Sequence, residues 1–172
     1  MRILNAGQIK AVLERFAREM TRQYGSLDQV VFIGVRTRGP YVAKRLAQLI
    51  KKRHGKEIPV GEMDITLYRD DLNALLPGGS IDHTRIPFDI ANKIVVLFDD
   101  VLHTGRTVRA AVDHLIDLGR PRMIHLAVMI DRGGRELPVA ANYVGKTIKL
   151  ATGGNVEVRL REVDKTDEVL VE

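Results

Sequence analysis

The sequence contains no cysteine and no tryptophan, and aromatic residues make up only 5% of its 172 residues. The absence of cysteine excludes disulfide bonds, thiolate metal ligands and a cysteine nucleophile. No apolar run approaches the length of about 18 residues that a membrane-spanning helix needs, so no membrane association is expected. Residues 1–5 also lack the apolar core of a secretory signal peptide, and we therefore expect a cytoplasmic protein.

The composition that is present is typical of a soluble globular protein. Hydrophobic residues account for 45% of the chain and charged residues for 28%. The length suits one domain with a substantial core, so we expect residues 1–172 to form a single unit. A formal net charge of +5 suits a ligand rich in phosphate, but a basic balance is also common in proteins that bind no nucleic acid.

The most informative stretch runs from Ile94 to Leu118. Residues 94–98 form an apolar run rich in β-branched side chains, which predicts a strand buried on both faces. Asp99 and Asp100 follow directly, and a loop with threonine and glycine comes next. From Val108 onward, apolar residues spaced by three and four predict an amphipathic helix that ends near Gly119.

This order of elements predicts a site for a phosphorylated sugar. Free N–H groups and the positive end of the helix dipole would attract a phosphate, while Thr104 and Thr107 would add hydroxyl donors. Gly105 would let the backbone approach closely, and the two carboxylates would accept hydrogen bonds from a ribose diol. Neither the P-loop pattern nor the dinucleotide-binding pattern is present. The alternative is an acidic pair in an ordinary α/β loop, such as one that holds a metal ion.

Two further strands are followed by charged loops. Residues 30–35 predict a buried strand that leads into an Arg/Thr/Gly loop (36–39) and a helix, and residues 123–130 precede a loop at 131–138. The first of these loops is either an anion clamp or a solvated basic loop. Because open α/β sheets bind ligands at the carboxyl ends of their strands, we expect the three loops to gather at one edge.

The other elements follow from the same patterns. Helical spacing predicts a helix at about 6–24, and partial alternation predicts a strand at 58–68. Residues 72–85 show no clear period, and so long a loop is often a lid. Short strands are expected at 143–144, 156–163 and 169–171, as a cap or an edge over the sheet.

Residues 96–110 resemble the phosphoribosyl pyrophosphate (PRPP) motif of type I phosphoribosyltransferases. Further stretches, which include DITLYRDDL and DRGGRELP, narrow the resemblance to the bifunctional pyrimidine operon attenuation regulator/uracil phosphoribosyltransferase family, known as PyrR. The resemblance covers nearly the whole chain. It implies the α/β type I phosphoribosyltransferase fold: a central, mostly parallel sheet flanked by helices, a flexible lid loop (about 70–86) and a small C-terminal β cap (about 140–172).

The resemblance also implies a reaction in which uracil and PRPP give UMP and diphosphate, with Mg²⁺ bridging the substrate's pyrophosphate and ribose hydroxyls. No metal site made by the protein alone is expected. Asp99, Asp100 and Arg38 would be catalytic, and catalysis would depend on positioning and electrostatics because no general base is evident. The implied ligand-binding residues are Thr37, Arg38, Asp99, Asp100, Val101, Leu102, His103, Thr104, Gly105, Arg106, Thr107, Arg132 and Val156.

The resemblance implies which part of the substrates each group of these residues would bind. Thr37 and Arg38 would bind pyrophosphate, residues 104–107 the 5′-phosphate, and Arg132 and Val156 the base. His103 stands where the family usually has tyrosine, and we expect it to replace one loop aromatic with another rather than to bind ligand.

A second function of the family is RNA binding. The resemblance implies that UMP or UTP promotes binding of a pyr mRNA leader hairpin, here through Arg15, Arg18, Arg22 and Lys146. Glu14 and Ala140 depart from the family pattern on the presumed RNA face, where other members have threonine and arginine. The alternative is a phosphoribosyltransferase without an RNA role, or one that acts on another base. A homodimer or homotetramer is expected.

Overall fold

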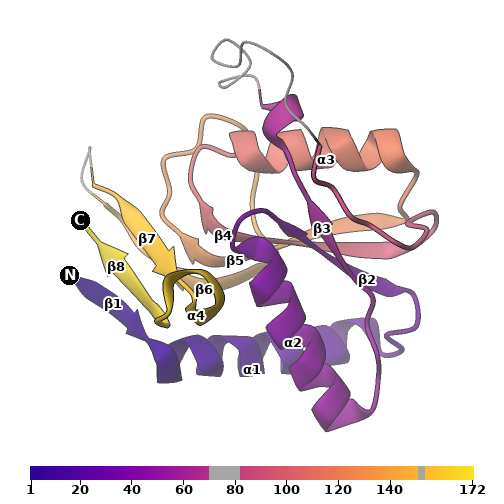
Figure 1. Cartoon of the computed structure of the whole chain (residues 1–172), viewed down its shortest axis with the longest axis horizontal. Helices are drawn as coiled ribbons and strands as arrows, with labels where there is room; N and C mark the ends of the chain where they lie inside the picture. Colours follow the sequence, from indigo (N-terminus) through magenta and orange to yellow (C-terminus); the bar gives the residue numbers. More distant parts are fainter. Residues whose placement is uncertain (70–81, 151–153) are drawn as a thin grey trace.

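The computed structural model describes residues 1–69, 82–150 and 154–172 (Figure 1). Its main sheet has five parallel strands in the order β3-β2-β4-β5-β6. These strands are β2 (Val30–Val35), β3 (Val60–Met63), β4 (Ile94–Leu102), β5 (Met123–Asp131) and β6 (Tyr143–Thr147). A second, antiparallel sheet in the order β1-β8-β7 joins the two ends of the chain, and consists of β1 (Arg2–Asn5), β7 (Val156–Arg159) and β8 (Glu168–Val171).

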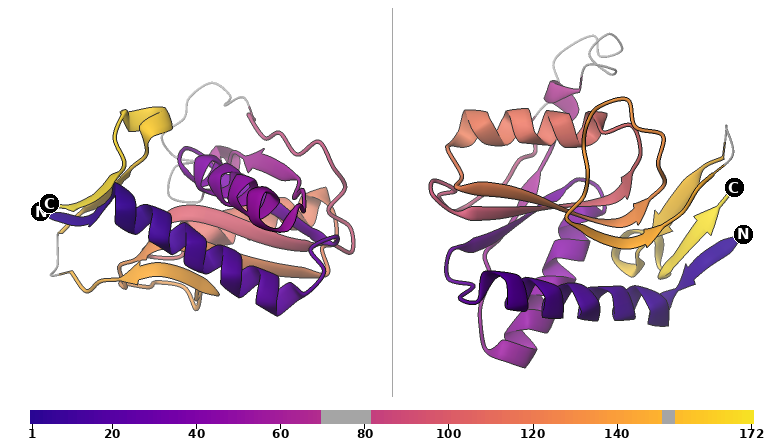
Figure 2. Two further views of the ribbon diagram at one scale, coloured as in Figure 1. Left: turned by 90° about the horizontal axis from the view of Figure 1, so that it is seen from below. Right: turned by 180° about the vertical axis from the view of Figure 1, so that it is seen from behind.

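Helices cover both faces of the main sheet, as Figure 2 shows from two directions. Helices α1 (Ala6–Tyr24) and α2 (Gly39–His54) lie on one face, and α3 (Arg106–Leu118) lies on the other. Strand β4 contributes to both cores because Val96 and Phe98 pack toward α1 and α2, while Val95 and Leu97 pack toward α3. The unbroken apolar run at 94–98 is therefore the expected signature of a strand that is buried on both faces.

The helix boundaries follow from local sequence. Asn5 and Gln8 form a capping box at the start of α1, each side chain accepting from the other residue's backbone N–H at 2.9 Å. Gly55 ends α2 in a left-handed conformation, with a φ of 65°. None of the helices in the described part of the chain is both long and apolar enough to span a membrane.

The prediction of a parallel sheet flanked by helices is confirmed, but several details differ. The predicted strand at 58–68 ends at Met63, because the Asp64 carboxylate accepts from the N–H and hydroxyl of Thr66 and turns the chain into a 3₁₀ helix, η1 (Thr66–Tyr68). The predicted strand at 156–163 stops at Arg159 and is followed by a short helix, α4 (Arg161–Asp164).

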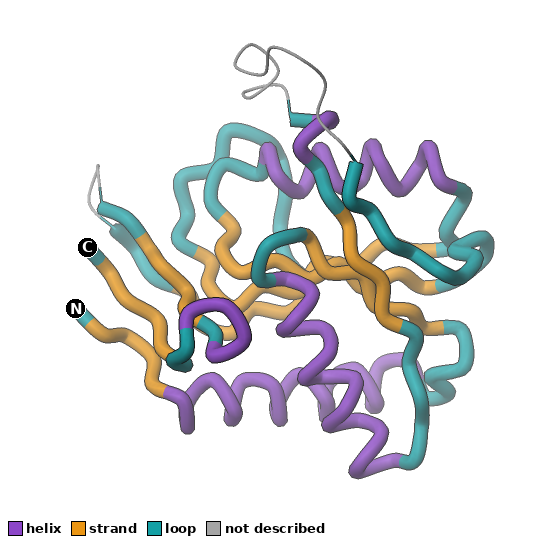
Figure 3. The backbone as a smooth tube through the Cα atoms, in the orientation of Figure 1, coloured by secondary structure: helices purple, strands orange, loops and turns teal. Residues whose placement is uncertain are grey.

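The C-terminal cap is also built differently from the prediction. Strand β6 lies inside the predicted cap (about 140–172) but extends the main sheet, pairing with β5. The cap is completed by β1, which was not predicted and which pairs with β8 (Figure 3). Most of the predicted lid loop (about 70–86) lies outside the described residues, and its described end is fixed where Arg85 pairs with Glu62.

Candidate active site

The predicted phosphate loop forms one wall of a cavity at the start of α3. Gly105 precedes the helix in a left-handed conformation with a φ of 93°, and the Thr104 hydroxyl accepts from the N–H of Arg106 at 3.3 Å. The cavity has a volume of about 410 Å³. It is lined by Arg69, Asp99, Val101, Leu102, His103, Thr104, Gly105, Arg106, Thr107, Val108 and Glu136.

The acidic pair lies within β4 rather than after it, because the strand continues to Leu102. Asp99 is only 7% exposed and pairs with Val128 of β5, whereas Asp100 is half-buried. Burial and the neighbouring Asp100 carboxylate raise the pKa of Asp99. The Asp99 carboxylate accepts from the N–H of Asp100 at 2.9 Å, so its position is fixed by its own strand.

A second cavity, of about 370 Å³, adjoins the first. Four residues line both cavities, namely Arg69, Asp99, Val101 and Thr107. The other residues around the second cavity are Arg36, Thr37, Asp64, Ile65, Thr66, His83 and Asp100. Asp99 thus lies between the 104–107 loop on one side and the Arg36–Thr37 loop on the other, and Asp100 lines the second cavity. The Arg36–Thr37 peptide bond is cis.

Two glycines bring the 36–39 loop against the acidic pair. A Cβ at Gly39 would lie 2.3 Å from the carbonyl oxygen of Phe98, which directly precedes Asp99. A Cβ at Gly34 would lie 2.1 Å from the backbone nitrogen of Pro40. The first turn of α2 therefore contacts both β2 and β4 at backbone distance, which only glycine permits.

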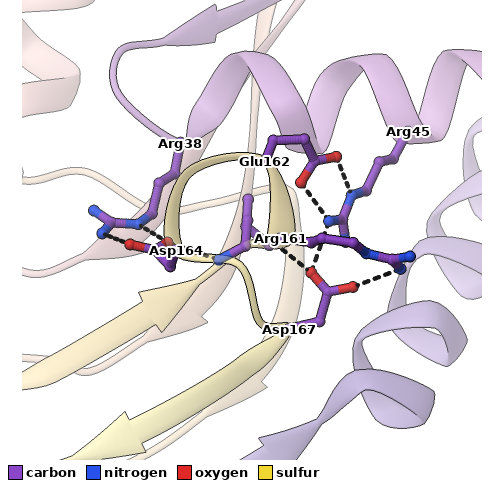
Figure 4. A network of polar contacts seen from close by, with 7 residues as sticks. Arg38, Arg45, Arg161, Glu162, Asp164 and Asp167 are labelled. Carbon is purple, nitrogen blue, oxygen red and sulfur yellow. Dashed lines mark hydrogen bonds and ion pairs between the residues drawn. The ribbon is translucent and has the colours of Figure 1, made fainter.

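Arg38 is held from the opposite side by the C-terminal segment. Its Nε and Nη2 donate to the Asp164 carboxylate of α4 at 3.1 and 2.8 Å (Figure 4). The hydrogen bonds with Asp164 raise the pKa of Arg38, and the nearby Asp100 carboxylate adds to this effect. Arg38 itself lines neither of the two adjoining cavities.

The two residues predicted to contact the base lie close to one another. Arg132 follows β5, and its guanidinium donates to the carbonyl oxygen of Gly154, two residues before Val156. The buried Nε of Arg132 has no hydrogen-bond partner within the described chain. Neither Arg132 nor Val156 lines the two adjoining cavities, so the structure places the predicted base contacts beside this cleft rather than in its walls.

His103 is exposed and packs against the loop after β5. A Cβ at Gly134 would lie 2.9 Å from the His103 ring, and the His103 carbonyl accepts from Arg135 at 3.0 Å. Burial and the charge on Arg132 lower the pKa of His103. The ring therefore packs as a loop side chain while it also lines the first cavity.

Three acidic or basic residues of the cleft, namely Asp64, Arg69 and Glu136, were missed from the sequence. Arg69 lines both cavities, and Asp64 lines the second. Glu136 lines the first and pairs with Arg106 at 2.6 Å, tying the loop after β5 to α3. The DITLYRDDL stretch contains Asp64 and Arg69 and was the available signal, but no sequence pattern showed that it returns to the acidic pair.

The residues predicted to contact RNA fall into two groups. Arg15 donates to the carbonyl oxygens of Val144 and Gly145 at 2.7 and 2.9 Å, and Lys146 donates to that of Ile3 at 3.1 Å. These two side chains therefore tie β6 to α1 and β1. In contrast, Arg18 and Arg22 project from α1 as exposed residues.

The structure also shows where Glu14 and Ala140, the two departures from the family pattern, lie. Glu14 pairs with Arg53 of α2 at 3.1 Å, so its charge is partly balanced. Ala140 is exposed in the segment that precedes β6.

Comparison with known proteins agrees with this architecture. Residues 1–162 match the model of the phosphoribosyl transferase domain. The "Bifunctional protein PyrR" of Chloroflexus aurantiacus is 52% identical over 169 residues, covering 98% of this chain and 93% of that protein. The protein of the same name from Deinococcus radiodurans is 50% identical, with coverages of 96% and 90%.

Solved structures show the same fold at much lower identity. The hypoxanthine phosphoribosyltransferase of Trypanosoma cruzi aligns with a TM-score of 0.75 and 15% identity, covering 99% of this chain and 94% of that one. That of Staphylococcus aureus aligns with a TM-score of 0.71 and 19% identity, with coverages of 98% and 90%. The chain belongs to the phosphoribosyl transferase domain family and, within that family, to the PyrR proteins.

Proposed function

We propose that this protein transfers the phosphoribosyl group of PRPP to uracil, giving UMP and diphosphate, and that it also regulates pyrimidine biosynthesis by binding a pyr mRNA leader. The observation that carries the enzymatic proposal is the position of Asp99 and Asp100. Asp99 lines both of the adjoining cavities, and Asp100 lines the one that also contains the Arg36–Thr37 loop.

The 5′-phosphate of PRPP would bind in the first cavity. Residues 104–107 line this cavity at the start of α3, where the helix dipole favours negative charge. Their backbone N–H groups and threonine hydroxyls would bind the phosphate. The backbone of residues 101–103 continues the same wall. Arg106 also lines the cavity, and its positive charge is partly balanced by Glu136.

The ribose would lie over the acidic pair and the pyrophosphate over the 36–38 loop. When the bond between the anomeric carbon and pyrophosphate breaks, positive charge develops on the ribose. A carboxylate whose charge is disfavoured by burial, as in Asp99, interacts more favourably as that positive charge appears. Arg38 and Thr37 would stabilise the negative charge on the leaving pyrophosphate.

Uracil would bind beside Arg132, which follows β5, and Val156, which begins β7. The unpaired Nε–H of Arg132 is a donor with no partner in the described chain, which suits an acceptor on the base. N1 of uracil would then attack the anomeric carbon, and alignment of the two substrates would provide much of the rate enhancement.

Mg²⁺ would accompany PRPP. Asp64 and Asp100 supply carboxylate oxygens to the second cavity, and oxygen ligands suit this ion. The described residues contain no group of three metal-binding side chains, so the ion would take ligands mainly from substrate oxygens. Bound in this way, it would neutralise negative charge on pyrophosphate.

The enzymatic proposal is tested by an assay for uracil-dependent release of diphosphate from PRPP, with UMP identified as the other product. Hypoxanthine and orotate serve as control bases in the same assay. Diphosphate release and UMP formation with uracil, and no diphosphate release with hypoxanthine or orotate, would support the proposal. If diphosphate were released only with a different base, that base and not uracil would be the substrate.

The RNA-binding proposal depends on the PyrR resemblance and on exposed positive charge. Arg18 and Arg22 are exposed on α1, and the net charge of +5 favours a phosphate-rich partner. Binding of a labelled pyr leader hairpin should weaken steeply with salt and strengthen with UMP or UTP. Binding that is insensitive to both nucleotide and salt would remove the regulatory half of the proposal.

The last part of the proposal concerns where the protein acts and how many copies of the chain assemble. We expect the protein to act in the cytoplasm as a homodimer or homotetramer, as in the family it resembles. Sedimentation equilibrium of the purified chain measures its assembly directly, and a monomer at micromolar concentration would contradict this expectation.

A further inference from the structure

We propose that Asp164 is a positioning residue for Arg38, which holds the guanidinium so that its remaining N–H groups are presented to the pyrophosphate of PRPP. The inference rests on the proposed phosphoribosyl transfer and adds to it a residue from the C-terminal sheet. Asp164 lies 126 positions after Arg38 in the sequence, on the turn between β7 and β8.

The geometry of the pair is bidentate. Arg38 Nε donates to one Asp164 oxygen at 3.1 Å and Nη2 donates to the other at 2.8 Å. An arginine side chain has five N–H donors in a fixed plane, so two are used by Asp164 and three remain. Both hydrogens of Nη1 are among the three, and they lie on the guanidinium edge that Asp164 leaves open (Figure 4).

Asp164 itself is firmly placed. One of its oxygens also accepts from the N–H of Leu160 at 2.8 Å, which fixes the carboxylate against the start of α4. The side chains of Arg38 and Asp164 are 24% and 16% exposed, so water screens the pair less than it would an ion pair on the surface. Consistently, the hydrogen bond with Arg38 lowers the pKa of Asp164.

The turn that carries Asp164 is anchored to α2 by a separate group of charges. Arg45 of α2 donates to Glu162 at 2.8 Å and to Asp167 at 2.7 Å, and Asp167 also accepts from the backbone of Arg161 at 2.8 Å (Figure 4). Arg38 immediately precedes α2, and Arg45 lies within that helix. The helix and the turn are thus joined at two places, and the second joint does not involve Arg38.

Asp164 also opposes a competing attraction. The Asp100 carboxylate is close enough to Arg38 to contribute to its raised pKa. Without Asp164, the guanidinium would be drawn toward Asp100 and away from the pyrophosphate. Holding Arg38 on the far side keeps its guanidinium available to the pyrophosphate.

The experiment compares Asp164→Ala and Asp164→Asn with Glu162→Gln, a change on the same turn that does not touch Arg38 and leaves Asp167 to hold Arg45. For each variant we would measure the KM for PRPP, the KM for uracil and the Kd for UMP. We expect Asp164→Ala to raise the KM for PRPP about tenfold, as for loss of a charged hydrogen bond. Asp164→Asn should have a smaller effect in the same direction, and Glu162→Gln should match the wild type.

UMP provides the decisive control because it has a 5′-phosphate and a ribose but no pyrophosphate. The Kd for UMP should therefore stay within about twofold of the wild type in both Asp164 variants, as expected for independent contacts. An equal rise in both constants would mean that Asp164 only supports the fold, and the inference would be wrong. A lower KM for PRPP would mean that Asp164 competes with pyrophosphate, which also overturns it.

The design separates this inference from the proposed function. A wild-type protein that binds neither PRPP nor UMP would contradict the proposed function itself, whatever the variants do. A wild type that turns over PRPP, combined with an Asp164→Ala variant of unchanged KM, would contradict only the role of Asp164.

Discussion

Gly39 offers the sharpest test of how the fold positions the site. A Cβ at this position would lie 2.3 Å from the Phe98 carbonyl oxygen, whereas ordinary contact begins at 3.4 Å. Gly39→Ala must therefore move the start of α2 away from the end of β4 by about 1 Å. Overpacking of this kind typically costs roughly 1–3 kcal/mol of the free energy of unfolding.

The expected effect on activity is larger than the effect on stability. Arg38 immediately precedes Gly39 and Asp99 immediately follows Phe98, so the shift changes the distance between the pyrophosphate loop and the acidic pair. A displacement of about 1 Å at a reacting centre can lower turnover roughly 100-fold. Steady-state kinetics with PRPP and uracil, together with urea unfolding, would measure both quantities on one preparation.

Gly55→Ala is the matched control because it makes the same chemical change at the other end of α2. Gly55 has a φ of 65°, and a Cβ there would meet nothing within 4 Å. We expect a stability loss of about 1–2 kcal/mol from the left-handed backbone, with turnover unchanged. If Gly39→Ala were as unstable as Gly55→Ala and equally active, the proposed dependence of the site on this close approach would be refuted.

Three further predictions concern the site and the RNA face. Burial and Asp100 raise the pKa of Asp99 above its ordinary value of 3.8, so the wild type should lose stability as the pH rises from 3.8 through the raised pKa. Above that raised pKa, Asp99→Asn should unfold at a higher urea concentration than the wild type, although it should bind UMP more weakly. Gly105→Ala should raise the Kd for UMP about tenfold, measured by calorimetry, because a φ of 93° is strained for alanine by about 1–2 kcal/mol. Replacing Arg18 and Arg22 by alanine should lower the number of RNA phosphates neutralised by about two, which makes the plot of log binding constant against log salt concentration less steep. The KM for PRPP should not change. An unchanged pH dependence, an unchanged Kd or an unchanged salt slope, respectively, would contradict these expectations.

Elements with a regular apolar pattern could be predicted from the sequence. The spacing in residues 6–24 and the run at 30–35 gave the observed bounds of α1 and β2. The strand at 94–98 was placed correctly but ended too early, because Asp99 and Asp100 suggested a loop. The structure keeps them in β4 through pairing with β5, a long-range interaction that a local pattern does not contain.

The site was predicted where its residues are contiguous and missed where distant segments meet. The Asp99–Thr107 stretch carries its own chemistry, so its cavity was expected. Arg69 enters the same cavity from η1, and Asp164 reaches Arg38 from α4. Neither contact leaves a periodic signal in the sequence. Strand β1 was also missed, because four residues are too few to show alternation and its pairing with β8 joins the two ends of the chain.

We propose that Asp99 and Asp100 bind the ribose while the loop before α3 binds the phosphate. A crystal structure of the protein with bound UMP would show both contacts. We predict a ribose hydroxyl within about 3 Å of an oxygen of the acidic pair, and phosphate oxygens at a similar distance from the backbone N–H groups of residues 105–107. A UMP molecule whose ribose and phosphate both lie away from β4 and α3 would contradict both assignments.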